Sequence, residues 1–99
     1  MEIKNIVEGN TLTLEIVGRL DTLTAPQLEE ELNTLVTNDI TDLVLDFKNL
    51  DYISSAGLRV LLAAQKMMNT KGGMKLINVN SEVREVFEIT GFEDILTIE

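Results

Sequence analysis

The chain has 99 residues, the size of one small domain, which leaves no length for a second core. Seventeen acidic against eight basic residues give a net charge of −9, which disfavours nucleic acid and anionic lipid as partners. Histidine and cysteine are both absent, which excludes an imidazole base, a thiolate nucleophile, a zinc-thiolate site and any disulfide. We therefore expect a single domain over residues 1–99, with no metal or other cofactor.

The apolar segments are too short for insertion into a membrane. The longest unbroken run, Val60 to Ala64, is far below the about 20 residues that a spanning helix needs. The opening residues lack the basic and apolar segments of a leader peptide. We expect a cytoplasmic protein without direct membrane insertion.

The first two elements are predicted to form a β-hairpin. Leu12, Leu14 and Ile16 alternate with polar residues, a pattern typical of a strand with one buried face. The pair Gly9-Asn10 separates them from residues 2–8, and both residue types tolerate the positive φ of a tight turn.

Helices and strands then alternate along the rest of the chain. Residues 24–36 predict an amphipathic helix capped by Thr24, with Gln27 at capping-box spacing. A short apolar strand over 43–47 precedes a helix from about Ala56 to Thr70, closed by Gly72-Gly73. The strand 74–79 and a third helix follow, the latter capped by Asn80 or Ser81 and ended by Gly91, with an edge segment over 94–98. The prediction is an α/β fold: a mixed sheet of four to five strands with three to four helices.

Ser54 and Ser55 stand where the second helix begins, yet they do not fit a catalytic site. A serine nucleophile needs a nearby base, and the chain has no histidine. The stretch Ile53 to Gly57 also lacks the first glycine of a G-x-S-x-G elbow. We expect one serine to cap the helix and the other to be a site where a removable phosphate changes partner binding.

The helix after the serines carries a second set of candidate residues. On a helical wheel Leu58 and Leu62 fall outside the main apolar arc, beside Arg59 and Lys66. Either a neighbouring helix covers the two leucines or they form a small docking patch with local positive charge.

Asp21 and Asp46 leave an enzymatic alternative open. Carboxylates near strand ends could bind magnesium, as in a receiver-like or nucleotide-hydrolysing domain. The simpler interpretation is that these aspartates stabilise turns and cap helices.

Three segments in register resemble the STAS domain family, and within it the stand-alone anti-sigma factor antagonists of bacteria. They are "GRLDTLTAPQLEEEL" (18–32), "LVLDFKNLDYISSAGLRVLL" (43–62) and "GGMKLINVNSEVREVFEITGF" (72–92). The resemblance implies a non-enzymatic regulator that binds an anti-sigma factor with serine kinase activity. Phosphorylation by that kinase would release it, and a PP2C-type phosphatase would reverse the modification.

Aligned on Gly57-Leu58, the family phosphoacceptor falls on Ser55, and Asp21 and Thr22 match a loop near that serine. Many antagonists have aspartate before the acceptor, where this chain has Ser54, which is therefore a second candidate acceptor. The full set of residues expected to bind the partner is Asp21, Thr22, Ser54, Ala56, Gly57, Leu58, Arg59 and Leu62. The family also implies an alternative: a scaffold that is not phosphorylated, or a soluble subunit of a lipid-transport ABC system.

Overall fold

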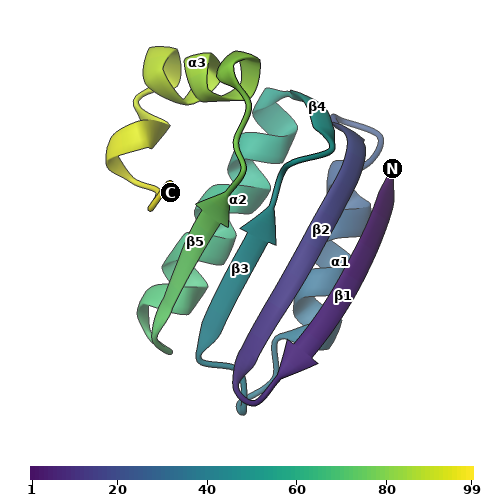
Figure 1. Cartoon of the computed structure of the whole chain (residues 1–99), viewed down its shortest axis with the longest axis vertical. Helices are drawn as coiled ribbons and strands as arrows, with labels where there is room; N and C mark the ends of the chain where they lie inside the picture. The colour runs from purple at the N-terminus through teal and green to yellow at the C-terminus, as the bar shows by residue number, and fades with distance from the viewer.

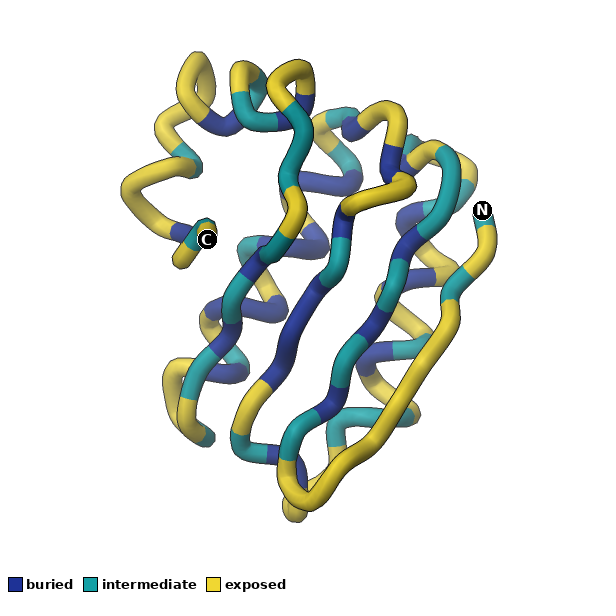
Figure 2. Tube along the Cα trace, in the orientation of Figure 1, coloured by how far each residue is buried: buried dark blue, intermediate teal, exposed yellow.

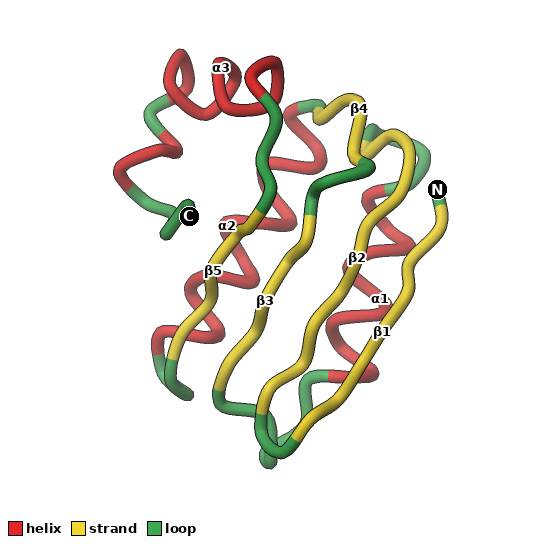
Figure 3. The backbone as a smooth tube through the Cα atoms, in the orientation of Figure 1, coloured by secondary structure: helices red, strands yellow, loops and turns green.

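A computed structural model describes residues 1–99 as a five-stranded mixed sheet with three α-helices, which confirms the predicted α/β class (Figures 1 and 3). The helices α1 and α2 lie on one face of the sheet, while α3 packs against β4 at its end (Figure 1). The elements are β1 (Glu2–Glu8), β2 (Thr11–Leu20), α1 (Ala25–Leu35), β3 (Asp42–Asp46), β4 (Leu50–Ile53), α2 (Ser55–Asn69), β5 (Gly73–Ile77), α3 (Ser81–Thr90) and a 3-10 turn (Phe92–Asp94).

The predicted hairpin opens the chain. β1 and β2 pair antiparallel, with Glu8 opposite Thr11 across the turn. Gly9 alone takes a positive φ there, 62°, so Asn10 does not use its tolerance for that conformation. Leu12, Leu14, Ile16 and Leu20 of β2 are fully buried, whereas β1 is exposed along most of its length (Figure 2).

The remaining strands run parallel to β2. The main sheet has the order β1-β2-β3-β5, and β4 pairs with the carboxyl end of β2 beyond a register shift at Gly18/Arg19. The sequence did not predict β4 as a strand. It has four residues, two of them exposed, and its partner is distant in the chain, so no periodic pattern identifies it.

The helix ends confirm some predicted caps and correct others. Asn80, rather than Ser81, caps α3, and its Oδ1 accepts a hydrogen bond from the Val83 N–H at 2.8 Å. Gly91 takes the left-handed φ of 81° after α3, as predicted. Thr24 precedes α1 but makes no side-chain capping bond, and Gln27 contacts Met1 instead of forming a capping box, so that prediction was wrong.

The Gly72-Gly73 pair does not stop α2 in the predicted way. The helix ends at Asn69, and neither glycine has a positive φ. A side chain on Gly72 would instead collide with the carbonyl of Thr41, so this glycine permits close packing of two backbone segments. The last segment adds only an isolated parallel bridge, Leu76 to Ile98, in place of a full strand.

The core lies between the sheet and its helices as one cluster of 23 buried residues. It includes the alternating leucines of β2, the apolar face of α2, and Val83 and Phe87 of α3. No helix combines the length and hydropathy that crossing a membrane would require.

Candidate functional site

Two loops meet at the carboxyl ends of β2 and β4. Leu20 pairs with Ile53, so the residues that follow, Asp21 and Ser54, leave the sheet side by side. The Ser54 N–H donates to the Leu20 carbonyl at 2.9 Å, which ties the two loops together. The predicted Asp21-Thr22 loop and the serine pair therefore belong to one surface.

The two serines have different environments. Ser54 has an extended backbone and caps α2; its half-buried Oγ faces the Gly57 N–H at 3.5 Å. Ser55 is the first residue of the helix and is exposed. The expectation that one serine caps the helix is confirmed for Ser54, and the cap leaves Ser55 as the accessible hydroxyl.

Gly57 sets how closely the start of α2 approaches the sheet. A Cβ atom at this position would lie 2.7 Å from Leu20 Cγ and 2.9 Å from Ile53 Cγ1. Only a residue without a side chain fits against both strand ends. Gly57 is buried, so it contributes to the site by position rather than by contact with a partner.

The structure shows which side of α2 is exposed. Leu58 is 6% exposed and joins the buried cluster that contains residues of α3, so of the two alternatives left open for this residue the structure supports coverage by neighbouring elements. Leu62 is only half-buried. The wheel could not decide between them because apolar residues cover most of this helix, and its orientation depends on packing with other elements. At helical spacing, Ser55, Arg59, Leu62 and Lys66 form the outward stripe, and neither cation joins an ion pair.

Asp21 organises the turn between β2 and α1, as the simpler interpretation predicted. Its Oδ1 accepts hydrogen bonds from the Leu23 and Thr24 N–H groups at 3.0 and 3.2 Å. The Thr24 hydroxyl donates to the Arg19 carbonyl at 2.7 Å and accepts from the Asp21 N–H at 2.8 Å. Partial desolvation would raise the pKa of Asp21, but these hydrogen bonds and the Arg19 charge outweigh it and lower the pKa from 3.8.

Arg19 and Leu23 are features of this surface that the sequence did not identify. The Arg19 guanidinium lies 3.7 Å from the Asp21 carboxylate and 4.1 Å from the centre of the Tyr52 ring. Leu23 projects from the Asp21 turn and is 89% exposed. No local sequence pattern predicts the contacts of Arg19 or the exposure of Leu23. The available signal was that Leu23 is an apolar residue inside a polar turn.

A pocket of about 330 Å³ lies between the first turns of α1 and α2. Thr22, Ala56 and Arg59 line it, together with Pro26 and Glu29. The pocket brings the loop and the helix start together beside Ser55. No group of three acidic side chains converges near this pocket or elsewhere in the structure.

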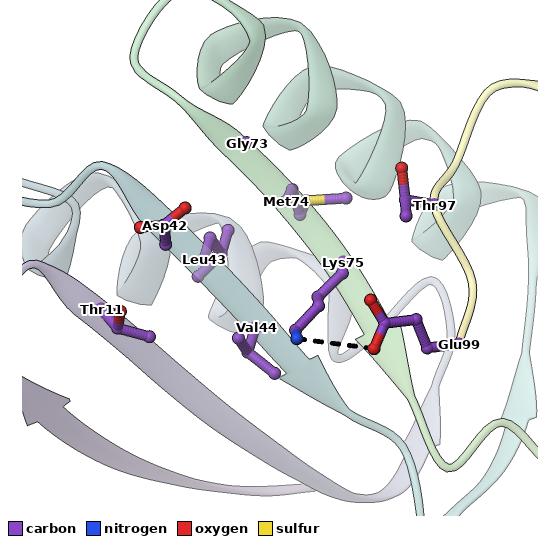
Figure 4. A pocket seen from close by; sticks show the side chains of 9 residues that line it. All are labelled: Thr11, Asp42, Leu43, Val44, Gly73, Met74, Lys75, Thr97 and Glu99. Atoms are coloured by element: carbon purple, nitrogen blue, oxygen red, sulfur yellow. Dashed lines mark hydrogen bonds and ion pairs between the residues drawn. The ribbon is translucent and has the colours of Figure 1, made fainter.

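A second pocket, of about 360 Å³, lies at the other end of the sheet (Figure 4). It is lined by the amino-terminal parts of β2, β3 and β5 and by Thr97 and Glu99. Lys75 pairs with Glu99 at 3.5 Å in its wall, and none of the predicted site residues lines it. The serine surface and this pocket are separate.

The family model of the STAS domain matches residues 2–99. The chain belongs to the STAS domain family. This STAS domain is similar to BtrV of Bordetella bronchiseptica, provisionally named an anti-sigma factor antagonist, at 45% identity over 82% of the chain and 71% of BtrV. It is 36% identical to the anti-sigma-B factor antagonist of Bacillus subtilis over 90% of the chain and 82% of that protein. The predicted resemblance is confirmed.

The fold of this STAS domain also matches SpoIIAA, an anti-sigma factor antagonist solved in two forms. The unphosphorylated form superposes with a TM-score of 0.76 at 19% identity, covering 99% of this chain and 87% of that one. The phosphorylated form, from Bacillus, gives 0.75 at 20% identity over 99% and 91%. At this identity the likeness establishes the shared fold.

Proposed function

We propose that the chain is an anti-sigma factor antagonist whose binding is switched by phosphorylation of Ser55. In its unmodified form it binds an anti-sigma factor that is also a serine kinase. Transfer of a phosphate to Ser55 by that kinase releases it, and a PP2C-type phosphatase restores the binding form. The docking surface consists of Asp21, Thr22, Ser54, Ser55, Ala56, Arg59 and Leu62.

The main support for the proposal is that the two serines have different roles: Ser54 caps α2, and Ser55 is exposed. Ser54 is occupied as the helix cap, and a phosphate on its Oγ would remove the contact to Gly57. Ser55 is exposed at the rim formed by the Asp21-Thr22 loop and α2. A kinase can therefore reach Ser55 without disturbing the helix start.

Charge explains how one phosphate could reverse the binding. The modification adds about −1.5 to −2 charges at the centre of a surface that faces the partner. Arg59 lies one helical turn after Ser55 and is free of ion pairs, so it can approach the phosphate on the same chain. The phosphate then both repels acidic groups of the partner and takes a cation away from the interface.

The relatives give independent support. Two of them carry the name anti-sigma factor antagonist, and SpoIIAA has a phosphorylated form. The chain has no histidine to activate a serine as a nucleophile, which supports a role for Ser55 as an acceptor of phosphate. Ser55 acts as a substrate in this proposal and not as a catalyst.

The test compares Ser55→Ala and Ser55→Asp for binding to the candidate anti-sigma kinase. We expect Ser55→Ala to stay bound when ATP is present, because no phosphate can be added, and Ser55→Asp to bind poorly without ATP. Ser54→Ala is the matched control, and it should lose binding in ATP as the wild type does.

If Ser55→Ala and Ser55→Asp both behave like the wild type, the switch is not at Ser55. Equal binding of all forms, with and without ATP, would favour the alternative of a scaffold or ABC-transport subunit that is not phosphorylated.

A further inference from the structure

We propose that Leu23 is the apolar anchor of the docking surface and inserts into a hydrophobic pocket on the anti-sigma kinase. This inference rests on the proposed function and names what the partner must supply. Leu23 is 89% exposed, the largest fraction among the large hydrophobic residues of the chain. Such exposure contributes nothing to the core, so the side chain is available for contact with another molecule.

The turn holds Leu23 in a fixed position. The Leu23 N–H donates to Asp21 Oδ1 at 3.0 Å, and the same oxygen accepts from Thr24 at 3.2 Å. Arg19 closes the turn from outside, through its carbonyl to Thr24 and its guanidinium to the Asp21 carboxylate. Because the backbone of the turn is already held by these contacts, little backbone entropy is lost when a partner binds Leu23, which favours it as an anchor.

Leu23 also lies close in the chain to residues that line the pocket beside Ser55. Its neighbour Thr22 lines the same pocket as Ala56 and Arg59, and Ala56 follows Ser55 directly. The turn that carries Leu23 therefore lies beside the surface that a partner covering Ser55 would contact. The complementary partner surface is an apolar pocket with a carboxylate beside it, the pocket for Leu23 and the carboxylate for Arg59.

The experiment measures the dissociation constant of the unmodified protein for the candidate anti-sigma kinase, with wild type, Leu23→Ala and Ile89→Ala. Ile89 is the matched control, since it is 77% exposed but lies on α3. Leu23→Ala should weaken binding about tenfold or more, mainly through faster dissociation, whereas Ile89→Ala should stay within about twofold of wild type. Circular dichroism and thermal melting should be unchanged for both variants, because neither side chain is buried.

A second variant tests the role of the turn. Asp21→Ala should weaken binding while Leu23 is present and should have little further effect in the Leu23→Ala background. Additive losses would contradict the idea that Asp21 acts by holding Leu23.

The outcomes distinguish failure of the Leu23 anchor from failure of the proposed function. If wild type binds the kinase and Leu23→Ala binds equally well, Leu23 is not an anchor and the proposed function stands. If the unmodified wild type does not bind, the proposed function fails and the inference fails with it. A wild-type dimer in sedimentation that Leu23→Ala abolishes would assign Leu23 to self-association and would also overturn the inference.

Discussion

Single residues decide how the surface around Ser54 and Ser55 is assembled. Gly57 lets the first turn of α2 lie against Leu20 and Ile53. This close approach explains why a residue without a side chain stands at position 57. Ser54 caps that turn, because its side chain accepts a hydrogen bond from the N–H of the same Gly57. The identity of the accessible serine follows from the same packing, since the register that buries Gly57 also turns Ser55 outward.

Replacing Gly57 should therefore damage both stability and the site. We expect Gly57→Ala to lower the free energy of unfolding by about 1–3 kcal/mol, because its Cβ would overlap Leu20 and Ile53 and the helix must shift. Urea denaturation measures the loss. Gly73→Ala is the control, since a Cβ there meets no atom within 4 Å and its φ is not positive. An equal loss in both variants would contradict the packing account.

At the scale of elements, the structure joins parts of the chain that local patterns leave apart. β4 connects the serine site to β2 on one side and to α3 on the other. Asn80 makes the second connection, because its amide nitrogen donates to the Leu50 carbonyl at 2.8 Å while its oxygen caps α3. The sequence predicts Asn80 or Ser81 as the cap, but no sequence pattern predicts the hydrogen bond from Asn80 to Leu50 of β4.

Loss of this side chain should therefore destabilise α3 and its contact with β4. We expect Asn80→Ala to lower the free energy of unfolding by about 1–2 kcal/mol, the range of a lost helix cap, with Ser81→Ala close to wild type. Chemical denaturation of both variants checks the assignment. If Ser81→Ala proves the more damaging change, the cap has been assigned to the wrong residue.

Sequence patterns predicted the elements with a clear periodicity or a strong end signal. The hairpin, the three helices and the strands β3 and β5 were all identified, as was Gly91. The errors arose where tertiary contacts decide the outcome. The helical wheel could not decide whether Leu58 is covered or exposed because it ignores neighbouring elements, and Gln65 is buried although its residue type suggests an exposed position.

At the scale of the whole molecule, the chain has a net charge of −9, but the outward stripe of α2 carries two cations, Arg59 one helical turn after Ser55 and Lys66 about three turns after it. A phosphate placed on Ser55 changes the local charge most where the partner is proposed to dock, while the core and the sheet remain as they are. In the proposed switch, the fold supports one reversible covalent change at Ser55.

The most direct measurement is mass spectrometry of the protein after incubation with its candidate kinase and ATP, with peptide fragmentation to locate the modification. The account predicts a single phosphate on Ser55, absent from Ser55→Ala and retained in Ser54→Ala. A phosphate on Ser54, or an unmodified protein that nevertheless dissociates from the kinase in ATP, would contradict it.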